Sequence, residues 1–102
     1  MDVASLISRL EREWDYSLGF FGRLRHGDFD PSGISRLVEI CELITPDGGE
    51  SINRRLVSLL WYMPIFMVWQ RDRVREAGGD VTEFERATNR IQSMVEKVLG
   101  AP

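Results

Sequence analysis

The sequence predicts an all-α protein, a single-domain four-helix bundle whose third helix is buried and kinked by a proline. Three observations support this prediction. Apolar residues recur at helical steps of three and four along most of the chain, and no useful stretch alternates as a strand would. An unbroken run of eleven apolar residues, 59–69, lies between charged flanks. The 102 residues, 43% of them apolar, suit one domain with one core.

The first helix is expected at about residues 2–25, where an apolar stripe runs from Val3 to Leu24. Asp2 is the expected N-cap, because a carboxylate accepts hydrogen bonds from the unpaired amides of a first turn. Gly19 and Gly22 interrupt the last third of this segment, so we expect the helix to weaken or bend there.

The second helix is expected at about residues 31–44. Asp30 and Pro31 open it as an N-cap acid and a proline whose fixed φ suits the first helical position. The sequence TPDGG at 45–49 is a strong stop signal.

The third helix is expected at about residues 51–77, with Ser51 as N-cap and a kink near residues 60–64 caused by Pro64. Its apolar run is about 16 Å long as a helix, roughly half of a bilayer core, so a membrane anchor is not expected. A helix that is apolar on all sides needs cover from its neighbours, and three two-faced helices are available.

The last helix is expected at about residues 80–99. Asp80 and Glu83 have the spacing of a capping box, and a regular apolar stripe follows them.

The charge balance makes a direct nucleic-acid ligand unexpected, because the net charge is −3. Residues 1–50 carry ten acids and five arginines, whereas residues 51–102 carry six acids and eight basic residues. The first half is therefore acidic and the second mildly basic. The N-terminal stretch has no apolar segment of signal-peptide length, so a cytoplasmic location is expected.

Residue types that carry chemistry are few, and no enzyme activity is expected. His26, the single histidine, stands beside Asp28 and Asp30, but helix-end and turn roles account for all three. Cys41, the single cysteine, is expected to be a small buried apolar residue. No cofactor and no metal are predicted, because no phosphate-binding glycine loop and no metal-spaced set of ligands is present.

Two blocks resemble a known family. Phe20, Gly22, Leu24, Gly27, Phe29 and Asp30 fit a recurring pattern, (F/Y)-x-G-x-L-x-x-G-x-(F/Y)-D. The later sequence NRRLVSLLWYMPIFM, residues 53–67, looks like a second block of an arginine followed by a tryptophan-bearing buried helix. Together they resemble the small immunity proteins of bacterial polymorphic toxin and contact-dependent growth inhibition systems.

The resemblance implies a non-enzymatic immunity protein that binds and neutralises a cognate toxin C-terminal domain, in some cases a nuclease with a basic cleft. An acidic first half would complement such a cleft. The expected partner-binding residues are Asp15, Tyr16, Phe20, Arg23, Asp28, Phe29, Asp30, Glu39 and Glu42.

A second function fits the apolar run as well. A helical adaptor or regulator would homodimerise through an exposed part of the third and fourth predicted helices. The sequence leaves both functions open.

Overall fold

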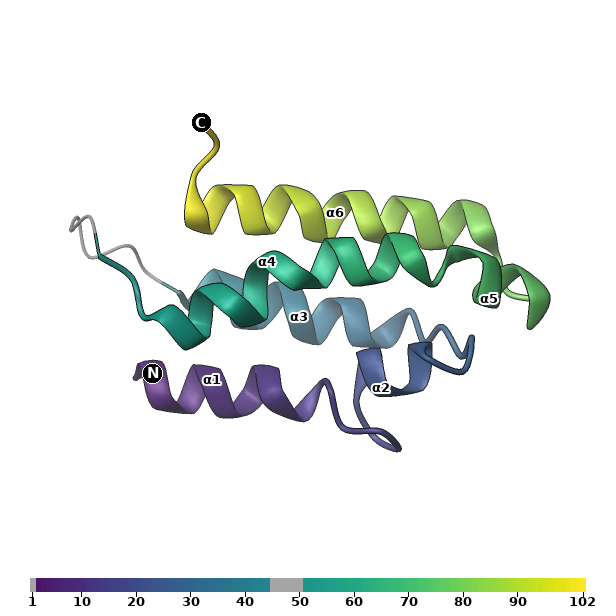
Figure 1. Ribbon diagram of the computed structural model, residues 1–102, viewed down its shortest axis with the longest axis horizontal. Helices are drawn as coiled ribbons and strands as arrows, with labels where there is room; N and C mark the ends of the chain where they lie inside the picture. Colours follow the sequence, from purple (N-terminus) through teal and green to yellow (C-terminus); the bar gives the residue numbers. More distant parts are fainter. Residues whose placement is uncertain (1, 45–50) are drawn as a thin grey trace.

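Four longer helices make the body of the protein in the computed structural model, which describes residues 2–44 and 51–102 (Figure 1). Two short helices complete these described ranges. The six helices are α1 (Val3–Arg12), α2 (Phe20–Leu24), α3 (Ser32–Leu43), α4 (Arg54–Trp69), α5 (Arg71–Glu76) and α6 (Val81–Leu99). The predicted all-α, single-domain fold is confirmed, and the four predicted segments correspond to six helices.

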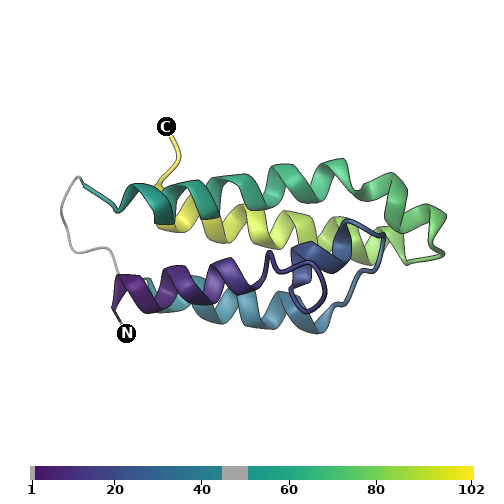
Figure 2. The same cartoon turned by 60° about the horizontal axis from the view of Figure 1, so that its bottom comes forward.

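The four longer helices run alongside one another in a molecule of 44 × 29 × 19 Å (Figures 1 and 2). Both α1 and α6 pack against α3 and against α4, so α3 and α4 lie at opposite corners of the bundle. The short helices α2 and α5 lie at the same end of the long axis (Figure 1). In the described part of the chain no helix is long and apolar enough to cross a membrane.

The predicted range of the first helix is wrong in its second half. The helix α1 ends at Arg12, and residues 13–19 form turns before α2. The backbone amide of Phe21 donates to the Glu13 carbonyl, and that of Gly19 donates to the Asp15 carbonyl. The chain therefore folds back on itself. This reversal stacks Phe21 on Trp14 with ring centroids 4.3 Å apart.

The third predicted helix is divided at Gln70, where α4 ends and α5 begins. Pro64 is buried inside α4, and the helix continues through it to Trp69. The N-cap of α4 is Asn53, whose side chain accepts from the amides of Arg55 and Leu56, so the prediction of Ser51 is wrong.

The other helices start close to the positions that the sequence predicts. Asp2 caps α1 through the Ser5 amide, and Asp80 caps α6 through the Glu83 amide. At the start of α3, Asp30 accepts from the amide and the hydroxyl of Ser32, and the helix begins one residue later than predicted. The predicted stop signal at 45–49 lies outside the described residues.

The core fills the space between α1, α3, α4 and α6, and α2 closes one end of it. Its largest fully buried side chains are Phe20, Phe21, Phe84, Leu10, Leu24, Leu37, Ile40, Leu56, Leu60, Met63, Met67 and Ile91. The helix α4 was predicted to be covered on most of its sides, and it contributes one continuous buried side. Its outer side leaves Trp61, Val68 and Trp69 exposed, so the neighbouring helices do not cover it fully.

Candidate functional site

The connection between α1 and α2, residues 13–19, is held by hydrogen bonds to α2, to α3 and within itself. Its first anchor is Glu13, which is buried although it carries a carboxylate. The Glu13 carboxylate accepts two hydrogen bonds from Arg36 of α3, at 2.9 and 3.0 Å, and one from the Phe20 amide at 3.1 Å. A buried carboxylate with this many donors fixes the position of the connection against α3.

The second anchor is Asp15, whose carboxylate accepts from the amides of Ser17 and Leu18 at 3.1 and 2.9 Å. The backbone of Asp15 lies directly against Gly22 of α2. A Cβ atom at position 22 would overlap the Asp15 carbonyl oxygen, so only glycine permits this approach.

These anchors leave two large apolar side chains in solvent. Leu18 is 81% exposed and Tyr16 is 68% exposed. The Tyr16 ring meets the edge of the His26 ring at a centroid distance of 4.5 Å. We call residues 13–19 the presenting loop, because a rigid backbone holds both side chains outward.

The residues that follow the presenting loop hold the start of α3. The Arg23 guanidinium donates to Asp28 at 2.9 Å and to Asp30 at 3.1 Å. Gly27 has a φ of +81°, which favours glycine at this turn. Phe29 packs edge-on between Phe20 and Phe84. The block FFGRLRHGDFD therefore forms a structural unit that joins α2 to α3.

The Asp30 carboxyl group and the Arg23 guanidinium show how the unit is stabilised. The Ser32 hydroxyl, with the Ser32 amide and Arg23, holds the pKa of Asp30 below its ordinary value of 3.8. The hydrogen bond from Arg23 to Asp28 raises the pKa of the Arg23 guanidinium.

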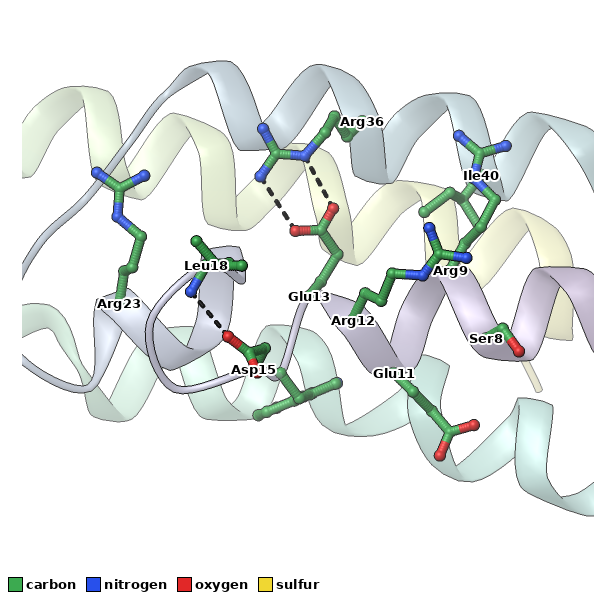
Figure 3. A pocket seen from close by; sticks show the side chains of 11 residues that line it. Ser8, Arg9, Glu11, Arg12, Glu13, Asp15, Leu18, Arg23, Arg36 and Ile40 are labelled. Atoms are coloured by element: carbon green, nitrogen blue, oxygen red, sulfur yellow. Dashed lines mark hydrogen bonds and ion pairs between the residues drawn. The ribbon is translucent and has the colours of Figure 1, made fainter.

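An open groove of about 1010 Å³ runs beside the presenting loop, between α1 and α3 (Figure 3). Figure 3 shows Leu18, Asp15 and Arg23 at one end of it and Arg9 and Ser8 toward the other. The groove is lined by Ser8, Arg9, Glu11, Arg12, Glu13, Trp14, Asp15, Leu18, Arg23, Arg36 and Ile40. Both arginines and acidic residues line it, so it has no single sign of charge.

The predicted partner-binding residues do not form one acidic patch. Arg23 neutralises Asp28 and Asp30, and Arg9 of α1 lies 3.5 Å from Glu39. Asp28, Asp30 and Arg23 lie near the start of α3, whereas Glu42 is exposed near its other end. The acidic side chains Asp28, Asp30 and Glu39 are therefore paired within the molecule, and their contact with a partner stays a prediction.

Phe20 does not lie on the surface as predicted, because it is 1% exposed and belongs to the core. The turn at residues 13–19 rotates α2 so that Phe20 and Phe21 both point inward. Phe29 is half-buried between two core rings. Tyr16 and Asp15 are the predicted residues that lie on the presenting loop.

Leu18, Glu13 and Arg36 are the residues of this surface that the sequence interpretation missed. Leu18 was expected in the apolar stripe of a long first helix. A helix that continued past Arg12 would have buried Leu18, and only the interruption by Gly19 and Gly22 indicated otherwise.

The single histidine and the single cysteine, whose side chains could be reactive, occupy structural positions. His26 is exposed beside Tyr16. Cys41 is buried in α3, as predicted, and burial raises the pKa of its thiol to about 11. Within residues 2–44 and 51–102, no three His, Cys, Asp or Glu side chains gather so that they could hold a metal ion.

A second exposed apolar surface lies on the outer side of α4. Trp61, Val68 and Trp69 are 49%, 60% and 62% exposed, and Tyr62 is half-buried between the two tryptophan rings. Arg25 lies 5.4 Å from the Phe66 ring centroid and 5.9 Å from that of Trp14, at the inner edge of this aromatic cluster.

Comparisons with protein-family models, with curated proteins and with solved structures give no match to this chain.

Proposed function

We propose that this chain is a non-enzymatic immunity protein, which binds a bacterial toxin domain in the cytoplasm and neutralises it by protein–protein contact. One observation carries the proposal: the presenting loop holds Leu18 and Tyr16 in solvent on a backbone fixed by Glu13, Asp15 and Gly22.

Rigid, exposed apolar side chains are suited to protein recognition. A leucine and a tyrosine in water gain free energy when a partner covers them, and a backbone that is already ordered loses little conformational entropy on binding. Interaction sites commonly concentrate their binding energy in a few such residues. Leu18 and Tyr16 are the central contacts in this proposal.

The mixed charges of the adjacent groove support a protein partner over a nucleic acid. Among the exposed residues that line it, Arg12 and Arg36 carry hydrogen-bond donors and Glu11 and Asp15 carry acceptors. Such a surface complements a mixed polar protein rim around the apolar contacts. A toxin with a uniformly basic cleft is not required.

The family resemblance supports the same proposal from the sequence. Its pattern includes Gly22, Gly27 and Asp30, which hold α2, the turn and the start of α3. The pattern therefore describes the scaffold that supports the presenting loop. The contact residues Tyr16 and Leu18 lie just before the pattern and are outside it.

Co-expression with the toxin encoded beside this gene tests the proposal. Cells that produce the toxin are expected to grow when this chain is present and to die without it. Leu18→Asp is expected to abolish protection, because a charged side chain would be desolvated in the contact.

The matched control is Leu43→Asp, at an exposed leucine near the far end of α3. It is expected to protect as well as the wild type. Killing that is unaffected by the wild-type chain would contradict the proposed function, and loss of protection by both variants would contradict the assignment to the presenting loop.

A further inference from the structure

A hollow of about 400 Å³ lies where α1, the end of α2 and α4 meet. Its apolar lining consists of the rings of Trp14, Trp61 and Tyr62 and the buried side chain of Leu59. The Tyr62 ring joins the other two rings, with centroid distances of 5.7 Å to Trp14 and 5.6 Å to Trp61. We call this site the aromatic hollow. Three rings and a leucine offer apolar cover to a side chain of a partner.

The charged side chains of the aromatic hollow leave one positive charge without a counter-ion. Arg55 pairs with Glu11 at 3.1 Å, so these two neutralise each other. Arg25 is exposed, and within residues 2–44 and 51–102 its side chain forms no hydrogen bond or ion pair. Its guanidinium lies instead over the rings of Trp14 and Phe66. A guanidinium that stacks on rings keeps the N–H donors in its plane for a carboxylate.

We propose that the aromatic hollow receives an apolar side chain of the toxin domain that lies next to a carboxylate, and that this carboxylate pairs with Arg25. The inference rests on the proposed function and adds the chemistry of the partner at one contact. The rings and Leu59 gain free energy when an apolar side chain covers them. The unpaired guanidinium favours an acid beside it. Aromatic rings also attract cations, but a basic partner side chain is disfavoured here because Arg25 repels it.

The aromatic hollow and the presenting loop form one continuous surface. Trp14 belongs to the presenting loop, and it lines both the aromatic hollow and the groove beside the loop. Arg25 precedes His26, whose ring contacts the exposed Tyr16 ring. One partner domain can therefore cover Tyr16 and also fill the hollow. A central apolar contact with a polar margin is the usual composition of a protein interface.

Peptide titration followed by NMR tests this chemistry without any toxin. The probes are acetyl-Gly-Phe-Asp-Gly-amide and its neutral counterpart acetyl-Gly-Phe-Asn-Gly-amide. The acidic peptide is expected to shift the indole N–H resonance of Trp61 with a dissociation constant on the order of 1 mM, and the neutral peptide to bind about threefold more weakly, because one exposed ion pair is lost. Equal affinity for the two peptides, or no shift of this resonance with either, would overturn the inference.

Variants of the aromatic hollow assign the two parts of the contact. Arg25→Gln is expected to remove the preference for the acidic peptide, and Trp61→Ser is expected to remove binding of both peptides. The ratio of the two dissociation constants is decisive for Arg25, because a general change in the rings would affect both peptides alike. Arg90→Gln, at an exposed arginine of α6 outside the hollow, is the matched control and is expected to keep the wild-type ratio. An unchanged ratio in Arg25→Gln would overturn the pairing of the carboxylate with Arg25.

The homodimer predicted from the sequence, through the third and fourth predicted helices, is the competing occupant. Sedimentation equilibrium of the chain alone is expected to give the monomer mass of 11.8 kDa. A dimer that dissociates in Trp61→Ser would overturn the inference, because a second copy would then cover the hollow.

Co-expression with the toxin tests whether the toxin domain occupies the hollow. Trp61→Ser is expected to lower protection, and Arg90→Gln is expected to protect as the wild type does. Full protection by Trp61→Ser would overturn the inference and leave the proposed function intact. Selective peptide binding by a wild-type chain that gives no protection would contradict the proposed function, so the two failures are distinguishable.

Discussion

At the scale of single residues, Gly22 decides the shape of the candidate site. Its missing side chain lets α2 lie against the Asp15 carbonyl, and this approach brings Phe20 and Phe21 into the core. The carbonyl belongs to backbone and cannot move aside as a flexible side chain could. A single methyl group at this position would separate two packed segments.

We predict that Gly22→Ala lowers the free energy of unfolding by at least about 3 kcal/mol, because the added carbon forces backbone movement in a packed region. Gly78→Ala is the control. Gly78 has a φ of +83° with nothing near its Cβ position, so the conformational strain alone is expected, about 1 kcal/mol. Urea unfolding measures both values, and equal losses would contradict the role given to Gly22.

The Asp30 carboxylate gives the protein a specific acid sensitivity. Its folded-state pKa lies below the ordinary value of 3.8, chiefly because the Ser32 hydroxyl donates to it. A depressed folded pKa contributes stability that is present above the unfolded pKa. That stability is lost as the pH falls from about 4 through the folded pKa.

Asp30→Asn is therefore predicted to reduce stability at pH 7 and to flatten the loss of stability below pH 4. Urea unfolding of both proteins across the acid range measures the difference between them. If the difference in unfolding free energy stays constant as the pH falls through this window, the Asp30 carboxylate is not its source.

At the scale of secondary-structure elements, the helices with a side-chain cap and a regular stripe were predictable. α6 has Asp80, Glu83 and an uninterrupted stripe, and its predicted range differs from the observed one by one residue at the start. The first segment also has a continuous stripe, yet it folds back after Arg12. Periodicity cannot distinguish a long helix from two shorter ones whose apolar sides face the same core.

The candidate site was less predictable than the fold, for a related reason. The contact between Glu13 and Arg36 joins residues 23 positions apart, and no local pattern indicates it. Because this pairing and the turn at Asp15 set the direction of Leu18, the sequence placed Leu18 in the core and Phe20 on the surface. The structure has the reverse.

The start of α4 gives a prediction at this scale. Asn53→Ala is expected to lower the free energy of unfolding by about 1 kcal/mol, because the amides of Arg55 and Leu56 lose their side-chain acceptor. Ser51→Ala is expected to have no measurable effect, since Ser51 is outside the helix. A larger loss for Ser51→Ala would contradict the observed cap.

At the scale of the whole molecule, the two exposed apolar surfaces adjoin, because the Trp14 ring of the presenting loop lies 5.7 Å from the Tyr62 ring of α4. The groove beside the presenting loop is lined by residues of α1, α2, α3 and the presenting loop, whereas the exposed Trp61, Val68 and Trp69 belong to α4. α3 and α4 occupy opposite corners of the bundle. One hollow is lined both by Trp14 of the presenting loop and by Ser58 and Trp61 of α4.

Several acidic side chains in the first half of the chain form ion pairs within the molecule. Glu11 pairs with Arg55 of α4, Glu13 with Arg36, and Glu39 with Arg9. These pairs join α1 to α3 and α4. The net charge of −3 is consequently a property of the whole surface, and it does not locate a partner.

Calorimetric titration of the purified chain with the toxin domain proposed as its partner tests the central claim most directly. The account predicts one toxin domain bound per chain. It also predicts that Leu18→Asp weakens binding by at least about thirtyfold, the loss typical of a central contact residue, while Leu43→Asp binds as the wild type does. Wild-type affinity in Leu18→Asp, or no heat of binding for the wild-type chain, would contradict it.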